Sequence, residues 1–383
     1  MRAETAQRCG HVCNACWRPA VWTGADGALP LPWLAPALAD AQAQRSHHAM
    51  LLHAAAGHGA LELALALAQA GLCERPASAS VAGAPCGRCD SCRLLPTRGH
   101  PDLLLLMPEA MRHERQWPIA TDKPESADGS REGARKRASR QVRIDEIRLA
   151  LDWVVSTSSR GQGKWLVIHP ADALNNHAAS ALLKTLEEPP SGVQIILTAG
   201  DPAWLLPTIR SRCRSWRMAV PDRAVQRAWL TAAGVDDADV LLAAAGAEPL
   251  RARRMHEDGW RSSAWIELPR AISRGEPGWL GQCGIENALD ALQRLCHDLM
   301  CRSCGGSASF FPEAALPRPG DLAPLAAWQA ELMRWARNAD HPWQEPLLVD
   351  SLVVAARQAM AESAASARSR TRGGSGPLAT LSA

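Results

Sequence analysis

The chain has 383 residues, of which 47% are hydrophobic and 21% are charged, and its net charge is +3. The length exceeds one typical domain, the composition is that of a globular protein, and so small a charge is no argument for nucleic-acid binding. No apolar run approaches the roughly 20 residues of a membrane helix, and the N-terminus lacks a signal-peptide pattern, so we expect a cytoplasmic protein without membrane contact.

The first 28 residues contain a small group of potential metal ligands, Cys9, His11, Cys13 and Cys16. The spacing Cys9-x3-Cys13-x2-Cys16 can hold a metal if His11 or a distant group supplies the fourth ligand. The alternative, which we favour, is that residues 1–28 are a disordered extension.

An apolar run at 49–52 predicts the first core strand, and a glycine turn and a helix-favouring segment follow it. Strand, turn and helix form the topology of a phosphate-binding loop, which needs a lysine for the phosphates and a Ser/Thr hydroxyl for magnesium. Ala60 and Leu61 occupy those two positions. The sequence around Gly57 and Gly59 therefore predicts a degenerate loop without nucleotide, and an ordinary glycine turn would have the same consequence.

Four cysteines come next, with the spacing C-x12-C-x2-C-x2-C: Cys73, Cys86, Cys89 and Cys92. Four thiolates can bind one tetrahedral Zn²⁺, whereas disulfides are rare in cytosolic proteins. We therefore predict a structural zinc ion with no position left open for catalysis. His100 is a weaker alternative ligand.

Residues 108–141 separate a strand predicted at 103–107 from an amphipathic helix predicted to start at Val142. This segment has almost no apolar content and carries several cations, namely Arg131, Arg135, Lys136, Arg137 and Arg140. A flexible surface insertion is the favoured interpretation, and a contact to nucleic acid is the alternative.

The segment from Lys164 to Cys213 predicts two further strands, at 165–168 and 193–197, with a helix between them. Asn175 or Asn176 can cap this helix, because a side-chain oxygen there accepts from its first amides, and two prolines at 189–190 stop it. Strand, helix and strand in this order are typical of a parallel sheet.

The run Ala181-Leu-Leu-Lys-Thr-Leu-Glu-Glu-Pro-Pro190, followed by Ser211-Arg212-Cys213, resembles the clamp-loader branch of the AAA+ ATPases over about residues 30–220. The resemblance implies an α/β fold: an AAA+-like P-loop domain with a parallel sheet and a zinc-module insertion, then a small helical lid domain and an all-α collar domain. The predicted boundaries are 29–220 for the AAA+-like domain with its zinc module at 73–92, 221–275 for the lid, 276–363 for the oligomerising collar, and 364–383 for a disordered tail.

The resemblance also distinguishes the chain's own nucleotide site from the nucleotide site of a neighbouring subunit. An ATPase of this family has Asp-Glu where this chain has His169-Pro170, and those carboxylates hold magnesium and polarise the attacking water. In clamp loaders the arginine of the Ser-Arg-Cys motif points across a subunit interface to the neighbour's γ-phosphate. By resemblance this arginine finger is Arg212, framed by Ser211 and Cys213. A surface arginine near a strand end is the alternative.

The resemblance therefore implies a non-hydrolysing stator in the clamp loader of a DNA polymerase III holoenzyme, with ATP bound by the neighbouring subunit. Its expected partners are the gamma/tau ATPase subunits and the delta subunit in a hetero-oligomer, and through the complex the sliding clamp and primed DNA. Polymerase activity would belong to other subunits of the holoenzyme. Two alternatives stay open: a gamma/tau-like ATPase, and a zinc-containing DNA-binding module.

Overall fold

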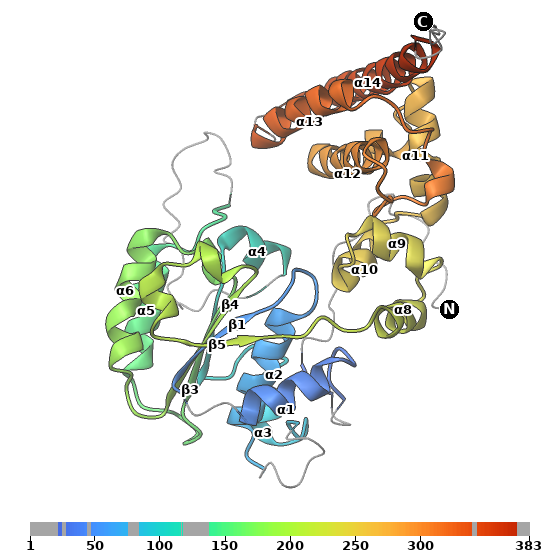
Figure 1. Cartoon of the computed structure of the whole chain (residues 1–383). Coiled ribbons are helices and arrows are strands. Elements are labelled where there is room, and N and C mark those ends of the chain that lie inside the picture. The colour runs from blue at the N-terminus through green and yellow to red at the C-terminus, as the bar shows by residue number, and fades with distance from the viewer. Residues whose placement is uncertain are drawn as a thin grey trace, which may run out of the picture. The chain divides into compact units, whose positions relative to one another are not determined.

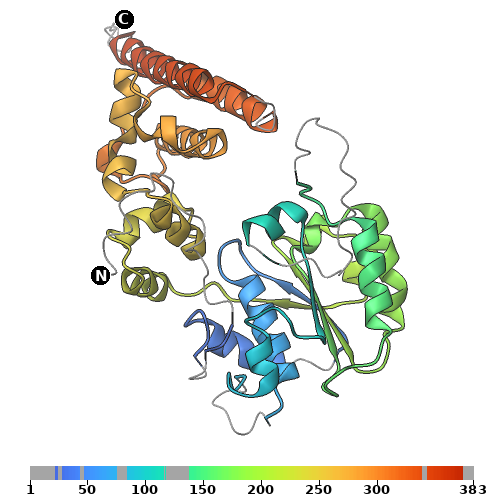
Figure 2. The same ribbon diagram turned by 180° about the vertical axis from the view of Figure 1, so that it is seen from behind.

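The computed structural model describes residues 22–24, 28–43, 47–75, 84–115, 117, 138–338 and 343–373. The chain divides into two compact units, Met1–Gln226 and Arg227–Ala383 (Figures 1 and 2). The predicted ligands Cys9, Cys13 and Cys16, most of the cationic insertion and the last ten residues lie outside the described part. The finer division of the second unit into lid and collar stays a prediction.

A five-stranded parallel sheet with the order β2-β3-β4-β1-β5 forms the centre of the first unit. Its strands are β1 (Ala49–His53), β2 (Leu103–Leu106), β3 (Lys164–Ile168), β4 (Val193–Ala199) and β5 (Arg214–Arg217). The first four confirm the predicted strands. The fifth was missed because only Trp216 of its four residues is buried, so it has no apolar run.

Helices cover both faces of the sheet (Figures 1 and 2). α1 (Leu34–Ala43) and α2 (Ala60–Leu72) lie on one face, with the short α3 (Asp90–Leu94) against α2, and α5 (Ile144–Val154) and α6 (Asn176–Glu187) lie on the other. α2 approaches the sheet closely, since a Cβ added to Gly71 would stand 1.9 Å from the Trp165 indole. Only glycine fits there without repacking.

α6 begins and ends as the sequence predicts. Of the two candidate caps, Asn175 is the one used, because its side chain accepts a hydrogen bond of 2.9 Å from the Ala178 amide. The helix ends at Glu187, just before the proline pair. This end of α6 lies beside Arg212, whose Nε is 2.6 Å from Glu187 Oε1.

The flexible insertion predicted at 108–141 is corrected in its first part, where α4 (Glu109–Glu114) forms. Arg112 makes an ion pair of 2.6 Å with Glu146, and Glu109 accepts a hydrogen bond of 2.8 Å from Arg143. These two contacts attach α4 to the start of α5. α4 is held by charge pairs and not by a buried apolar face. Its sequence therefore has no apolar periodicity, and the helix was not predicted.

The second unit is helical throughout the residues that the structure describes. After α7 (Pro207–Arg210) in the first unit, α8 (Arg223–Ala232) leads into it. The remaining helices are α9 (Ala238–Ala244), α10 (Pro249–Glu257), α11 (Ser262–Arg274), α12 (Ile285–Ser303), α13 (Leu322–Arg337) and α14 (Glu345–Gly373). Most of the buried apolar side chains of α8 to α14 belong to one continuous hydrophobic cluster.

The disordered tail predicted from residue 364 is also corrected, because α14 runs on to Gly373. Ser363 is buried and donates a hydrogen bond of 2.7 Å to the carbonyl of Asp321, which ties this part of the helix to its neighbour. Alanines after it favour continuation of the helix. In the described parts of the chain, no helix is both long and apolar enough to cross a membrane.

Candidate functional site

The glycine loop follows β1 and leads into α2. Gly57 and Gly59 have φ angles of 69° and 101°, a left-handed conformation that glycine adopts without steric cost. Between them His58 is buried, with its Nδ1 2.7 Å from the carbonyl oxygen of Ala56. The Trp33 indole donates a hydrogen bond of 2.8 Å to the His58 carbonyl. The loop is therefore held by contacts within its own chain.

The charge at this loop is unsuited to a phosphate. Leu61 and Glu62 are each only 2% exposed at the start of α2. The Glu62 Oε2 lies 3.7 Å from the point where a Cβ on Gly59 would stand, so a buried carboxylate faces the loop. Its cationic neighbour Arg115 is 3.7 Å away. A polyphosphate at this loop would meet a carboxylate already paired with Arg115, and it would lack the lysine that a P-loop offers at the position of Ala60.

His169 follows β3, at the position where an ATPase has its acidic pair. Its Nδ1 is 2.7 Å from the hydroxyl of Thr198, which is 1% exposed near the end of β4. Desolvation by the surrounding protein, with a smaller contribution from Arg115, lowers the pKa of His169 to about 3. The imidazole is neutral at pH 7, so it can neither bind magnesium as a carboxylate does nor add a positive charge.

The Ser-Arg-Cys motif, Ser211–Cys213, lies at the amino ends of the strands, whereas the glycine loop lies at their carboxyl ends. The motif directly precedes β5, whose first residue pairs with Met50 of β1. In a parallel sheet the amino ends of all strands lie at the same end of the sheet. The glycine loop, His169 and Thr198 lie at the other end, at the carboxyl ends of their strands. At about 3.3 Å per residue, the four residues of β5 alone put roughly 13 Å between the two ends of the sheet.

The Arg212 guanidinium is bound by its own chain. Its Nε donates to Glu187 Oε1 at 2.6 Å, and its Nη2 forms an ion pair with the same oxygen. Its Nη1 donates to the carbonyl of Thr208 at 3.0 Å and to the hydroxyl of Ser211 at 3.1 Å. Ser211 thus helps to orient the arginine.

Cys213 has a different task. It is buried in the core beneath α6, and burial raises the pKa of its thiol to about 12. A thiol of this kind is neither a nucleophile nor a metal ligand in its own right, since both roles need the thiolate. Cys213 therefore anchors the segment that carries Arg212.

The four predicted zinc ligands come together between α2 and α3. The sulfur atoms of Cys73, Cys86, Cys89 and Cys92 all lie within 4.8 Å of one another. Two of the sulfur pairs, Cys73–Cys89 and Cys86–Cys92, are 3.9 Å apart. Tetrahedral Zn–S bonds of about 2.3 Å would put the sulfurs about 3.8 Å apart, so this cluster can bind a metal ion.

Backbone amides also favour thiolate at this cluster. The amides of Arg88 and Cys89 point at the Cys86 sulfur, at 3.5 Å and 3.3 Å. Burial opposes ionisation of this thiol, but hydrogen bonds from these amides and from the Cys73 and Cys89 side chains together outweigh it and lower the pKa of Cys86 to about 6. Burial instead raises the pKa of Cys73 and Cys92. The donor set and its surroundings therefore suit a metal that prefers thiolate.

A polar network connects the cysteine cluster to the sheet. Asp102 is fully buried and accepts hydrogen bonds from the amides of Ser159 and Arg160, at 2.7 Å and 2.8 Å. The Arg160 side chain in turn donates to Glu74 at 2.9 Å, one residue after Cys73. The loop before β3 is thus fixed between the sheet and the cluster. Neither Asp102 nor Glu74 was predicted from the sequence to take part in such a network, because no local spacing marks contacts so distant in the chain.

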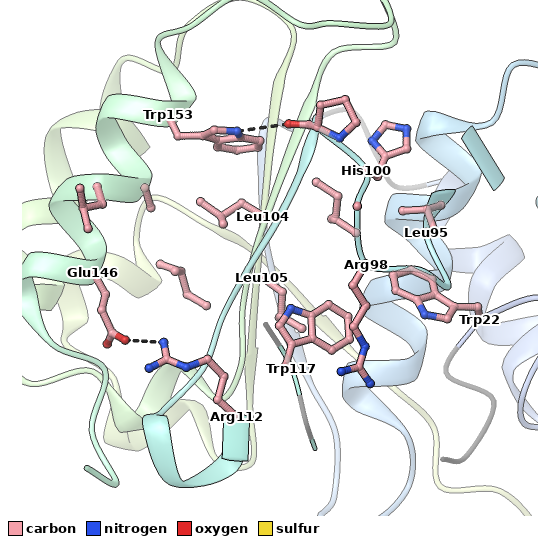
Figure 3. A pocket seen from close by; sticks show the side chains of 16 residues that line it. Trp22, Leu95, Arg98, His100, Leu104, Leu105, Arg112, Trp117, Glu146 and Trp153 are labelled. Carbon is pink, nitrogen blue, oxygen red and sulfur yellow. Dashed lines mark hydrogen bonds and ion pairs between the residues drawn. The ribbon is translucent and has the colours of Figure 1, made fainter. Parts of the chain in front are cut away.

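A pocket of about 450 Å³ lies along the edge strand β2 (Figure 3). Trp22, Trp117 and Trp153 stand around Leu104 and Leu105 in this view. Trp153 donates a hydrogen bond of 3.2 Å to a backbone carbonyl at the pocket's rim. Of the predicted site residues only His100, the alternative zinc ligand, lines this pocket, and no nucleophile is paired with a base among the described residues that line it.

The sequence is similar to proteins of known role. Residues 37–222 match a family described as DNA polymerase III, delta subunit. DNA polymerase III subunit delta' of Yersinia pestis is 30% identical over 312 residues, which are 78% of this chain and 82% of that protein. The chain belongs to the delta-prime subunits of the clamp loader of DNA polymerase III. The delta' subunit of Pseudomonas aeruginosa strain PAO1 is 34% identical over 249 residues, which are 64% of this chain but only 62% of that protein.

A more distant relative belongs to another subunit of the same enzyme. DNA polymerase III subunit tau of Escherichia coli K12 is 30% identical over 178 residues, which are 46% of this chain and 22% of that protein. This delta-prime subunit therefore shares part of its sequence with the tau subunit. Its glycine loop and His169, described above, carry no group that could neutralise a phosphate.

Proposed function

We propose that this delta-prime subunit is a stator of the clamp loader. It assists the ATP-dependent loading of the sliding clamp onto primed DNA and donates Arg212 to the ATP site of a neighbouring gamma/tau subunit. Its own glycine loop, around Gly57 and Gly59, binds no nucleotide. Membership of the delta-prime family supports the general role, and the geometry of the first unit supports the finger.

One observation carries the finger proposal: Arg212 lies at the amino ends of the strands, whereas its own glycine loop lies at their carboxyl ends. A guanidinium there cannot reach a nucleotide at that loop, so any phosphate it contacts must come from another chain. Arginine suits this task because it stays charged and can bind two phosphate oxygens at once. In phosphoryl transfer such a group stabilises the charge that develops on the transferred phosphate.

The four-cysteine cluster is proposed to hold a structural zinc ion. All four positions of a tetrahedral ion would be filled by Cys73, Cys86, Cys89 and Cys92, which leaves none for a substrate. The ion would fix the connection between α2 and α3. It would take no part in the chemistry at Arg212.

The partners follow from the family. We propose a hetero-oligomer with the gamma/tau ATPase subunits and the delta subunit, which contacts the clamp and primed DNA as an assembly in the cytoplasm. The predicted lid (221–275) and collar (276–363) would serve this assembly. Trp204 supports a protein contact of the β4–β5 connection, the segment that also carries Arg212, because its indole is 80% exposed. Exposed tryptophans are frequent anchors of interfaces.

The test is Arg212→Ala in a loader reconstituted from its subunits. Assembly and folding should be unchanged, because the side chain is exposed in part and its loss buries no charge. ATP turnover at the adjacent site in the presence of primed DNA should fall by about 10³-fold or more, as is typical for arginine fingers. Total turnover should fall by the share that this site contributes.

Arg210→Ala is the matched control, since Arg210 is exposed at the end of α7, two residues before the finger. It should leave turnover unchanged. An Arg212→Ala loader with the wild-type rate would refute the finger, whatever the role of the rest of the chain.

A further inference from the structure

In this structure Arg212 is not presented as an open finger. The three nitrogens of its guanidinium all have partners within the chain: Glu187 for Nε and Nη2, and Thr208 and Ser211 for Nη1. The edge formed by Nε and Nη2 is one of the two that can bind a pair of oxygens side by side. It is occupied by a carboxylate.

Both members of this ion pair are fixed by rigid neighbours. Glu187 is the last residue of α6, which is capped by Asn175 at its start. Arg212 stands between α7 and β5, with the buried Cys213 beside it. The pair is nevertheless open to solvent, since the side chains of Arg212 and Glu187 are 33% and 49% exposed. A partner subunit can therefore reach it.

We propose that Glu187 is a positioning residue that latches Arg212 until a neighbouring subunit presents its ATP. This inference rests on the finger proposed above. The carboxylate and a γ-phosphate compete for the same guanidinium edge, so the finger can engage only when Nε and Nη2 leave Glu187. A magnesium-bound triphosphate offers more oxygens than one carboxylate and can complete the exchange. Glu187 thus sets how readily the finger is released.

The latch predicts a gain of function when it is weakened. Glu187→Gln keeps the size of the side chain and one acceptor oxygen but removes the charge. In a reconstituted loader without DNA, kcat for ATP should rise about two- to five-fold, the range that corresponds to an exposed ion pair. KM for ATP should stay constant, because the nucleotide is bound by the neighbour.

Glu188→Gln is the matched control. Glu188 is the next residue, is also exposed, and carries the same charge, but Arg212 is bound by Glu187. This variant should behave as the wild type. The double variant Glu187→Gln/Arg212→Ala should have the low rate of Arg212→Ala alone, because a latch has no effect without the finger it holds.

The outcomes separate the two proposals. If Glu187→Gln leaves kcat unchanged, or lowers it as Arg212→Ala does, the latch is wrong; a lowered rate would mean that the carboxylate holds the finger in its working orientation. If Arg212→Ala itself is without effect, the finger fails and the latch fails with it. A raised rate in Glu187→Gln that persists in the double variant would also contradict the latch.

Discussion

Four positions at the carboxyl side of the sheet carry side chains that cannot stabilise a phosphate. Ala60 and Leu61 stand where a P-loop has its lysine and hydroxyl. The carboxylate of Glu62 lies next to the loop, and the neutral His169 follows β3. Each residue alone would weaken nucleotide binding, and together they leave the loop as a structural turn. In the proposed function, Arg212 instead acts on phosphate at a neighbouring subunit.

The low pKa of His169 has a consequence for stability. The pKa of histidine in an unfolded chain is about 6.5. Between that value and about 3, the unfolded chain takes up a proton at this residue and the native chain does not. Stability therefore falls as the pH falls through this window. From pH 7 to pH 5, His169 should contribute about 2 kcal/mol to the loss in the free energy of unfolding.

Urea titrations at pH 7 and pH 5 measure this loss. His169→Asn should be less sensitive to acid by about that amount, even if its stability at pH 7 is lower. His177→Asn, which replaces an exposed histidine on α6, should keep the sensitivity of the wild type. Equal losses in the wild type and in His169→Asn would show that the ring is protonated in the native state.

At the level of secondary structure, the ends of helices and strands position the functional groups. Apolar periodicity predicted β1 to β4, α5 and α6, because each of these buries a regular apolar face. β5 has a single buried residue and gave no such signal. The contact between Glu187 and Arg212 could not be predicted either. The two residues are 25 positions apart, and they meet only because β5 pairs with β1 in one particular register.

The cysteine cluster is the element for which sequence spacing was sufficient. Three ligands lie within one short turn, and Cys73 ends the helix that leads to them, so local geometry brings the sulfurs together. The network from Asp102 through Arg160 to Glu74 was not predictable, because it depends on how the loop before β3 packs. The cluster and this network together fix one end of the sheet.

Metal analysis of the purified chain tests the zinc proposal. We expect about one zinc ion per chain. Cys89→Ser should lose the metal and lower the melting temperature, whereas Cys304→Ser, which changes an exposed thiol in the second unit, should do neither. Replacing Cys9, Cys13 and Cys16 together should keep the metal. Metal-free wild-type protein, or zinc that persists in Cys89→Ser, would contradict the proposal.

For the molecule as a whole, the family resemblance predicted more of the fold and the function than any single sequence pattern did. The block that ends at Pro190 and the Ser-Arg-Cys motif led to the clamp loader, and the delta-prime relatives confirm that assignment. Composition and charge alone would not have suggested it. Many buried apolar side chains of the second unit belong to one cluster, and its division into a lid (221–275) and a collar (276–363) stays a prediction.

The central claim is that this chain has no nucleotide chemistry of its own and acts on a neighbour's ATP. The most direct measurement is a titration of the purified chain with a fluorescent ATP analogue in the presence of Mg²⁺. We predict no saturable binding, because the glycine loop offers a carboxylate and apolar groups instead of a lysine and a hydroxyl. Saturable binding accompanied by hydrolysis would contradict the claim and would make the chain a motor subunit.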